Sequence, residues 1–577
     1  MLFAKRQFFQ TFQDTLKISG GKGRTGFYKS LFLSSFNSFL EVFTLASAIP
    51  LILYYISRPE KPEGRFAEVF ESILQYPLFN ESIVNVLLLL AMILLLKNVI
   101  GVYISYFQMS LCYGVASNLS AKLLEKYYEQ PYLQFAQSNS GEHHNEINNV
   151  PTLFAYNILL GYVYIFSELT VVIILSTALI IVSPYIFLLV TLFLVSISLL
   201  ALWLKNRYAR KISNSKRSYF SSTSKALMKA LDGYVAIRLF RKQSFFVDRY
   251  SEKLKPLQAL STKDQVLQTV PMRVLEMAGF LGVIIIIFLF SKAGKSATEM
   301  ATILGLFATA AYRIIPSFNR LISRSVTIKS NLYLLEILKN RLFSTKDSTD
   351  HSTEKIDMIK SLAAVQIALD YGDKSVLKGV SFTINAGDIF GISGTSGSGK
   401  TTLINVLIGL LEPHKGHVLL NGKPFSPYEN PRWFEKIALV GQNPLMIDGS
   451  IAANIAFGSH TSDIDYERMK DSLRQVGLAK FCSEETGGLH KETGENGLQL
   501  SGGEKRRIAL ARALYRDSEV LFFDEITNDL DVESAELIYT LLEKLSKRGK
   551  IVIWVTHDQR GLDICTHTFD LRTGSAS

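Results

Sequence analysis

The sequence is poor in cysteine and tryptophan, with three residues of each among 577. The three cysteines, Cys112, Cys482 and Cys565, lie far apart, so they form neither a disulfide framework nor a set with metal-ligand spacing. The first residues, MLFAKRQFFQTF, lack the continuous apolar core and small-residue cleavage site of a signal peptide. We expect this stretch to be amphipathic and to lie at the inner membrane surface.

Charged residues are also scarce, at 20% against 48% hydrophobic, and the apolar residues fall in long runs. A chain of this length is too long for one core. Six runs can cross a hydrocarbon layer of roughly 30 Å. They cover about 28–57, 82–112, 152–182, 184–206, 267–290 and 300–325. We expect an α-helical transmembrane domain over 1–340, a polar linker over 341–359 and an α/β domain over 360–577.

The net charge of +11 is concentrated beside the apolar runs. Fifteen Lys and Arg residues lie between Lys205 and Lys263, and six between Lys5 and Lys29. This is the positive-inside pattern, which predicts that the N-terminus and the 205–265 segment are cytoplasmic. We expect a multi-pass protein of the cell (inner) membrane whose C-terminal domain is also cytoplasmic. The basic residues are thereby explained without a nucleic-acid partner, and we expect none. Between the first two spans, a short external helix is expected at about 64–76.

A glycine-rich loop follows the strand-like DIFGIS and precedes the helical LINVLIGLL. It reads GTSGSGKTT, which is GxxxxGK[ST] in strand, loop and helix context. Such a loop cradles phosphates with backbone N–H groups, while Lys400 reaches the β- and γ-phosphates and Thr401 offers its hydroxyl to Mg²⁺. The alternative is a glycine-rich turn without a ligand. The expected nucleotide contacts here are Gly394, Thr395, Ser396, Gly397, Ser398, Gly399, Lys400, Thr401 and Thr402.

Two further motifs supply carboxylates and a second anion site. The apolar strand EVLFFDE ends in Asp524, expected to hold Mg²⁺, and Glu525, expected to polarise the attacking water. LSGGEKRRIALARAL opens an amphipathic helix with glycines, which predicts an anion-binding helix start. Its candidate residues are Ser501, Gly502, Gly503 and Glu504. One nucleotide does not need two such sites, whereas two chains arranged head to tail would use both.

These motifs, in this order, resemble the nucleotide-binding domain of ABC transporters over residues 360–577. The resemblance implies that Tyr371 stacks on adenine, Gln442 senses Mg²⁺ and the γ-phosphate, and His557 contacts the γ-phosphate. One six-span half ahead of one ATPase domain is similar to the exporter type of half-transporter. That resemblance implies ATP hydrolysis with Mg²⁺ and a homodimer with two active sites. It also implies docking segments near Ser140–Val150 and Tyr234–Tyr250.

Four positions depart from the family's usual pattern. Glu504 stands where Gln is usual, and Asn528 and Asp529 replace Ser-Ala. Asp558 follows His557 where exporters often have Arg. None of these changes removes an expected phosphate or metal ligand, so we still expect ATP hydrolysis.

Ionisable residues inside the expected spans are costly and therefore functional candidates. They are Glu41, Lys97, Arg273, Glu276 and Arg313. At 1.5 Å per residue, four of them share a level roughly 20 Å from the outer surface, and Arg273 lies about a turn nearer the cytoplasm. The excess positive charge predicts a cavity for an anionic group. Internal ion pairs and snorkelling side chains are the alternatives. Arg320 and Arg324 are expected at the cytoplasmic edge.

The membrane half also resembles bacterial flippases for lipid-linked oligosaccharides. The matching stretches include FNSFLEVFTLASAIPLI, LLLKNVIG, VPMRVLEMAGF and AAYRIIPSFNR. The resemblance implies transfer of an anionic amphiphile, a polyprenyl pyrophosphate-linked sugar, from the inner to the outer leaflet of the bilayer. Export of peptides, other lipids or drug-like amphiphiles is the alternative within transport. An ATP-gated channel or regulatory subunit is the alternative outside it.

Overall fold

The computed structural model describes most of the chain in two compact units. The described residues are 2–57, 83–137, 143–182, 215, 218–220, 222–292, 297–343, 355–372, 374–483, 487–527, 530–572 and 575–576. The first unit comprises Met1–Gln130 and Ala136–Ser344, and the second Pro131–Phe135 and Thr345–Ser577. The expected external helix at 64–76, the expected span at 184–206, and Asn528 and Asp529 lie outside the described residues.

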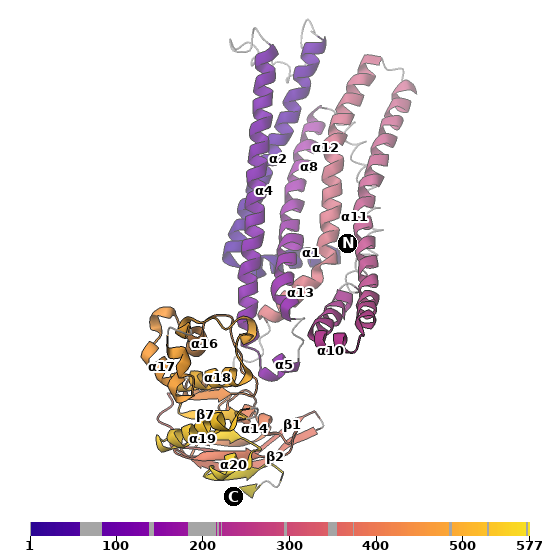
Figure 1. Cartoon of the computed structure of the whole chain (residues 1–577). Coiled ribbons are helices and arrows are strands. Elements are labelled where there is room, and N and C mark those ends of the chain that lie inside the picture. Colours follow the sequence, from indigo (N-terminus) through magenta and orange to yellow (C-terminus); the bar gives the residue numbers. More distant parts are fainter. Residues whose placement is uncertain are drawn as a thin grey trace. The chain divides into compact units, whose positions relative to one another are not determined.

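Long helices that pack against one another make up the first unit (Figure 1). They are α2 (Gly20–Ser57), α4 (Ile83–Tyr128), α8 (Leu160–Val182), α11 (Gln243–Lys292) and α12 (Ala297–Ser330). Among the described residues, two helical stretches, Ala91–Tyr128 and Asn145–Thr177, are long and apolar enough to cross a membrane. Several helices extend well beyond the expected spans, because their polar ends continue the helical pattern.

Small residues allow α2 to approach its neighbours closely. A Cβ atom on Gly26 would lie 2.3 Å from Leu111 of α4, and one on Gly23 would lie 3.1 Å from Val115. Further along the same contact, Gln108 donates a hydrogen bond of 2.7 Å to the Ser34 hydroxyl. Close backbone approach with interhelical hydrogen bonds is how apolar helices associate in a bilayer, where water supplies no driving force.

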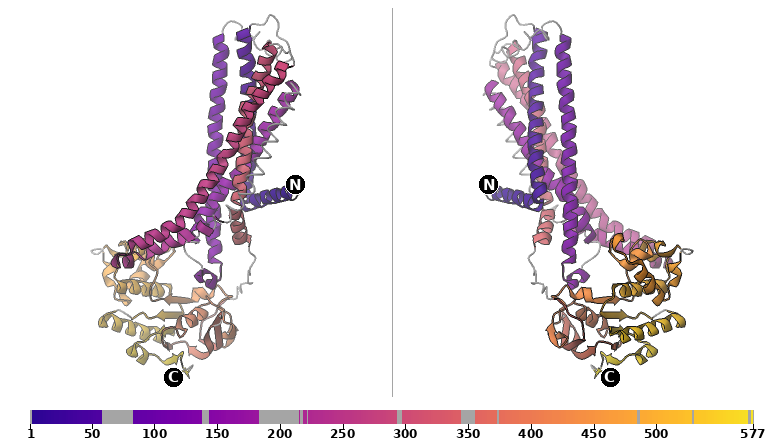
Figure 2. Two further views of the ribbon diagram at one scale, coloured as in Figure 1. Left: turned by 90° about the vertical axis from the view of Figure 1, so that its right-hand side faces the viewer. Right: turned by 90° about the vertical axis from the view of Figure 1, so that its left-hand side faces the viewer.

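Shorter helices pack around the long ones. Helix α1 (Leu2–Ile18) runs crosswise to the bundle (Figure 2). Its Phe12 ring lies 5.2 Å from Tyr162 and 5.6 Å from Phe27, between centroids. The remaining short elements of the first unit are η1 (Asn145–Asn149), α7 (Val150–Phe154), η2 (Ala155–Leu159), α10 (Tyr234–Leu239) and α13 (Leu332–Phe343). The residues of α5 (Tyr132–Gln137) are divided between the two units.

Two sheets form the framework of the second unit. The six-stranded sheet has the order β10-β9-β3-β8-β7-β6, and its strands are parallel except for β10. They are β3 (Ile389–Ser393), β6 (Ile437–Val440), β7 (Val520–Asp524), β8 (Ile551–Val555), β9 (His567–Asp570) and β10 (Ser575–Ala576). The antiparallel sheet, ordered β2-β1-β4-β5, contains β1 (Ser361–Tyr371), β2 (Lys374–Asn385), β4 (Lys415–Leu420) and β5 (Lys423–Phe425).

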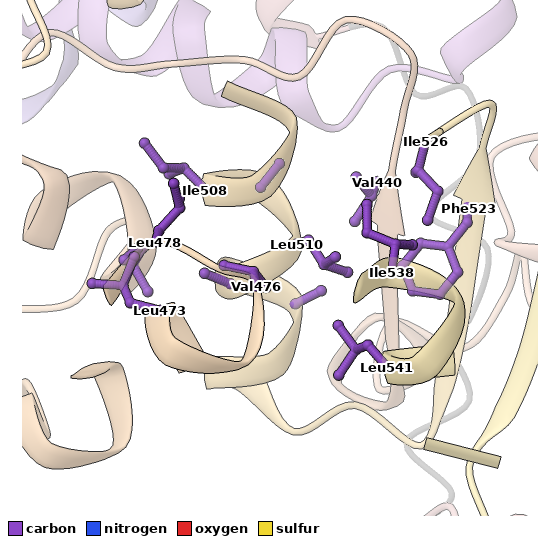
Figure 3. Close-up of a cluster of buried hydrophobic side chains, with 14 of the residues drawn as sticks. Val440, Leu473, Val476, Leu478, Ile508, Leu510, Phe523, Ile526, Ile538 and Leu541 are labelled. Atoms are coloured by element: carbon purple, nitrogen blue, oxygen red, sulfur yellow. The ribbon is translucent and has the colours of Figure 1, made fainter. Parts of the chain in front are cut away.

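Helices cover the six-stranded sheet and build a second layer of core. They are α14 (Lys400–Leu407), α15 (Trp433–Lys436), α16 (Ile451–Ala456), α17 (Tyr466–Gln475), α18 (Gly502–Arg516), α19 (Val532–Lys547) and α20 (Gln559–Asp563). In Figure 3, Ile508 and Leu510 of α18 lie in the same buried cluster as Leu473 of α17 and Phe523 of β7. The middle of α18 is therefore held in place by helical and sheet cores together.

Candidate functional site

The glycine-rich loop joins the buried strand β3 to helix α14. Gly394, Gly397 and Gly399 all have positive φ, at 149°, 79° and 103°. At Gly399, a Cβ atom would also approach Val376 of β2 to 3.0 Å. This backbone conformation is open to glycine at little cost, and it turns consecutive N–H groups inward.

Lys400 begins α14 and folds back into the loop. Its side chain is buried, and Nζ donates hydrogen bonds to the carbonyl oxygens of Gly394, at 2.7 Å, and Thr395, at 3.1 Å. The ammonium group is therefore enclosed by the loop, where it can meet an anion that the N–H groups bind. Thr401 and Thr402 follow in the first turn of the helix.

Three polar side chains meet at the carboxyl ends of neighbouring parallel strands. Gln442 follows β6, Glu525 follows β7, and His557 follows β8. Gln442 Nε2 donates a hydrogen bond of 3.1 Å to Glu525 Oε2, and His557 Nε2 lies 3.6 Å from Glu525 Oε1. The phosphate loop follows β3, in the same sheet, so all four loops leave the edge at which such sheets bind ligands.

Glu525 has an unusual backbone conformation. Its φ is 54°, in the left-handed region that residues with a Cβ atom rarely occupy. The Glu525 N–H donates to the carbonyl oxygen of Val555 at 2.9 Å, which fixes the turn after β7. Strain of this kind, held by the surrounding fold, is typical of functional sites.

Asp524, at the end of β7, has a raised pKa. Burial raises the pKa of this carboxyl, and the neighbouring charge of Glu525 raises it further, while Lys400 opposes the shift. A divalent cation next to Asp524 would favour the ionised form. The Asp524 carboxylate, the hydroxyl of Thr401, which follows Lys400 in the chain, and nucleotide phosphates make up the kind of oxygen ligand set that Mg²⁺ takes. The residues present therefore fit Mg-ATP.

The start of α18 is closed by a reciprocal capping box. Ser501 Oγ accepts from the Glu504 N–H at 3.2 Å, and Glu504 Oε2 accepts from the Ser501 N–H at 2.7 Å. Gly502 and Gly503 form the first helical positions. The Ser501 hydroxyl and N–H are thus both engaged with Glu504, and the Ser501 carbonyl oxygen accepts from the Lys505 N–H at 3.0 Å.

Tyr371 lies at the end of a strand, whereas Asp558 caps a helix. Tyr371 ends β1 opposite Lys374, in the hairpin whose strand β2 packs beside Gly399, and is about one-third exposed. Asp558 caps α20 and accepts a hydrogen bond from Tyr539. Burial and this contact raise the pKa of Tyr539 to about 12. The acidic residue after His557 thus has a structural role.

Sequence reasoning missed two arginines that hold the segment after Gln442. Arg506 Nε donates to the Gln442 carbonyl oxygen at 3.3 Å. Arg512 donates to the carbonyl oxygens of Asn454, at 2.8 Å, and Leu445, at 3.0 Å. The Arg-rich pattern of α18 was the available signal, but its periodicity does not say which backbone groups the side chains reach.

The proposed membrane cavity is described only in part. Arg273 and Glu276 of α11 form an ion pair with 3.2 Å between Nη1 and Oε2, and their side chains are 80% and 38% exposed. Lys97 is half-buried on α4. Glu41 and Arg313 lie on α2 and α12, but their side chains are outside the described part of the structure. Convergence of the five residues therefore stays a prediction.

Arg320, which was expected at the cytoplasmic edge, has a partner that the sequence analysis did not name. Its guanidinium forms a two-pronged ion pair with Glu168 of α8, at 2.5 Å from Nε to Oε1 and 3.2 Å from Nη2 to Oε2. The Glu168 side chain is 9% exposed. One turn away, the Arg324 guanidinium lies over the Tyr164 ring at 4.5 Å. Sequence reasoning missed Glu168, although a carboxylate within the third apolar run was visible.

The two expected docking segments differ in their contacts. In the first, buried Glu146 accepts a hydrogen bond of 2.9 Å from Arg341 Nε of α13 and another from the Tyr127 hydroxyl of α4. This carboxylate ties the segment to the last helix before the linker. The second contains α10, with several exposed apolar side chains. They are Tyr234, Val235, Leu239 and Phe240.

The second unit carries a phosphate loop and carboxylates on a parallel sheet, and the first is a bundle of long apolar helices. Together they define the class: a membrane protein driven by a nucleoside triphosphatase. Comparison with known families specifies it further. The family described as "ABC transporter transmembrane region" matches residues 26–314, and "ABC transporter" matches residues 377–528. The chain belongs to the ABC transporter family.

Individual relatives agree with this assignment. A protein named ATP-dependent lipid A-core flippase from Saccharophagus degradans is 26% identical over 555 residues, covering 92% of this chain and 89% of its own. One of the same name from Xylella fastidiosa is 29% identical over 377 residues, covering 63% of each chain. The structure of a bacterial Atm1-family ABC exporter with ATP bound superposes with a TM-score of 0.74 over 96% of this chain and 93% of its own, at 18% identity.

These findings confirm the predicted fold class, a helical transmembrane domain fused to a P-loop ATPase domain. The chain is an ABC exporter half-transporter that binds ATP and couples its hydrolysis to translocation across a membrane.

Proposed function

We propose that two copies of this chain form a homodimer that moves an anionic amphiphile, such as a lipid-linked oligosaccharide, from the inner to the outer leaflet of the cell membrane. The N-terminus and the ATPase domain are cytoplasmic in this proposal. Residues 1–340 form the membrane domain and 360–577 the ATPase domain, joined by the linker at 341–359.

The observation that carries the ATPase mechanism is the meeting of Gln442, Glu525 and His557 at one sheet edge. In the proposal, Glu525 orients and polarises the attacking water, and Gln442 and His557 contact the γ-phosphate. Lys400 and the loop N–H groups hold the phosphates, Thr401 and Asp524 hold Mg²⁺ with Gln442 beside it, and Tyr371 stacks on adenine. Catalysis then relies on positioning and electrostatic stabilisation.

The second half of each ATP site would come from the partner chain. Ser501, Gly502 and Gly503 begin a helix whose positive end suits a phosphate, yet Ser501 bonds within its own capping box. A head-to-tail dimer would bring this helix start to the partner's phosphate loop. ATP binding would then hold the two ATPase domains together, and hydrolysis would release them.

The charge of the proposed cavity favours an anionic cargo. Because Arg273 and Glu276 neutralise each other, the excess of one positive charge per chain lies among Lys97, Arg313 and Glu41. Relatives named for flipping lipid A-core support a lipid as the class of cargo. A peptide, another lipid or a drug-like amphiphile is the alternative cargo, and the ATPase assignment leaves little reason for a channel or regulatory subunit.

Transfer in proteoliposomes tests the cargo. The purified full-length protein is reconstituted with fluorescent polyprenyl pyrophosphate oligosaccharide, and in parallel with lipid A-core glycolipid or a zwitterionic phospholipid. We expect ATP-dependent transfer of an anionic glycolipid, little transfer of the zwitterionic lipid, and none in the Glu525→Gln variant. Arg313→Gln should reduce transfer by about ten-fold, whereas Arg313→Lys should retain most of it.

Two results would count against the proposal. Equal transfer of zwitterionic and anionic lipids would contradict a positively charged cavity that selects an anionic cargo. ATP hydrolysis without transfer of any tested lipid would favour a peptide or drug-like cargo. Glu525→Gln serves as the matched control, because it changes one side-chain atom at the ATPase site and none in the membrane.

A further inference from the structure

A carboxylate lies at the start of α18, where the proposed dimer would bind the phosphates of the partner's nucleotide. Glu504 is the third residue of the helix, and its side chain is 14% exposed. The positive helix end attracts anions, but a fixed negative charge in the first turn repels a second anion. The glutamine that the family resemblance leads one to expect here carries no charge. Glu504 therefore requires a counter-charge if a nucleotide phosphate is to bind nearby.

Lys480, on the short helix η4 (Ala479–Cys482), lies beside this carboxylate. Its Nζ is 2.5 Å from Glu504 Oε1 and 5.0 Å from the centroid of the Phe481 ring. Burial alone would raise the pKa of Glu504, but hydrogen bonds from Lys480 and Ser501 hold it below its usual value. Glu504 is thus ionised at neutral pH, and Lys480 is its cationic partner.

The neighbouring arginines of α18 are engaged elsewhere. Arg506 Nε donates to the carbonyl oxygen of Gln442 at 3.3 Å, and Arg507 Nη1 to that of Gly477 at 3.4 Å. In the described part of the chain, the cation that hydrogen-bonds the Glu504 carboxylate is therefore Lys480. The pair joins η4 to α18 across 24 residues of sequence.

We propose that Lys480 is a positioning residue for nucleotide at the composite ATP site, and that it acts by neutralising Glu504. With the charge compensated, the start of α18 offers backbone N–H groups and the Ser501 hydroxyl to the ATP bound by the partner. The Ser501 hydroxyl oxygen already accepts a hydrogen bond from the Glu504 N–H. Lys480 acts through Glu504 and does not touch the nucleotide. This inference rests on the head-to-tail dimer proposed above.

ATPase kinetics of the full-length protein in proteoliposomes test the inference. KM for ATP and kcat are measured for the wild type, Lys480→Gln, Glu504→Gln and the double variant. Lys480→Gln should raise KM roughly five-fold, because it exposes phosphate to an uncompensated charge, and leave kcat within about two-fold. Glu504→Gln should not raise KM, because glutamine also completes a capping box. The double variant should return KM to the wild-type value.

The matched control is Lys470→Gln. Lys470 lies on α17 and pairs with Glu467, with 2.8 Å between Nζ and Oε1, so the variant removes a similar surface pair that does not include Glu504. Its KM should match the wild type. Lys480→Arg should also behave as wild type, which excludes misfolding as the cause of a raised KM. Added salt should lower the KM of Lys480→Gln relative to wild type, because it screens the repulsion.

The outcomes separate the possible roles of Lys480. An unchanged KM in Lys480→Gln overturns the inference. A KM that stays raised in the double variant also overturns it, because Lys480 would then contact the nucleotide directly. A wild-type protein that hydrolyses ATP without dimerising would instead remove the proposed dimer, and the inference with it. The KM comparison among variants therefore tests the role of Lys480, and the oligomeric state of the wild type separately tests the proposed dimer.

Discussion

At the scale of single residues, two adjacent carboxylates have different contacts. Glu525 accepts a hydrogen bond from Gln442 and lies beside His557, whereas Asp524, half-buried like Glu525, has a pKa raised by burial and by the neighbouring charge of Glu525. A carboxyl group whose pKa is raised in the folded protein is costly to keep ionised. The fold retains Asp524 at that cost, which is understandable if the carboxylate is needed for a metal ion.

We therefore expect Asp524→Asn to stabilise the protein without nucleotide while abolishing its response to Mg-ATP. Because the folded pKa is raised, the carboxyl favours folding only at acidic pH, and this contribution is lost as pH rises through the folded pKa. At pH 7 the variant should melt about 2 °C higher than the wild type, and the gain should disappear below about pH 4. Thermal unfolding of the full-length protein in detergent measures both effects.

The exposed carboxylate Asp563 on α20 provides the control. Asp563→Asn should leave both the melting temperature and the stabilisation by Mg-ATP unchanged. If Asp524→Asn lowers the melting temperature at pH 7, the carboxylate stabilises the fold and the proposed conflict between metal binding and stability is wrong.

At the scale of elements, α8 and α12 are joined by a charged contact within the helix bundle. Glu168 is almost fully buried and receives both prongs of the Arg320 guanidinium. Removing one partner of such a pair leaves a charge without its counter-ion in an apolar environment, whereas removing both leaves neutral groups. The Arg324–Tyr164 contact reinforces the same pair of helices.

We expect a double-mutant cycle to show this coupling. Arg320→Gln should lower the melting temperature by about 4 °C or more, because Glu168 is left buried and charged. Adding Glu168→Gln to that variant should restore at least half of the loss. The exposed pair Arg273–Glu276 is the matched control, and Arg273→Gln should shift the melting temperature by less than about 1 °C. Additive effects of Arg320→Gln and Glu168→Gln would refute the coupling.

The elements that sequence predicts best are those whose signals are local. The phosphate loop is recognisable because strand, glycine turn and helix adjoin, and the carboxylates of β7 because they end an apolar run. Contacts between distant segments have no such signal. Glu168 and Arg320 are 152 residues apart, and only helix packing shows that they pair. Lys480 likewise meets Glu504 through the packing of α17 and α18, which periodicity does not specify.

At the scale of the whole molecule, one chain carries two anion-binding motifs that the proposed head-to-tail dimer assigns to different ATP sites. The phosphate loop, Gln442, Glu525 and His557 share one edge of the six-stranded sheet, and Ser501 is the N-cap residue of α18, bonded to Glu504. If two chains meet head to tail, Lys400 of one chain and Ser501 of the other belong to the same site. Mixing of inactive chains can then restore activity, which a site contained within one chain would not allow.

We expect Lys400→Ala chains mixed with Ser501→Ala chains to form dimers with activity. In such a dimer one site carries both substitutions and the other carries neither, so an intact site remains. Wild-type chains mixed with Lys400→Ala/Ser501→Ala chains contain the same number of substitutions, but each of their sites is damaged. Dimers isolated through two different affinity tags should therefore show ATPase activity at least about ten-fold higher in the first mixture, because losing one such contact costs that much or more. Higher activity in the second mixture, whose wild-type chains keep an intact Lys400 and Ser501 together, would mean that each chain completes its own site, and the head-to-tail arrangement would then be wrong.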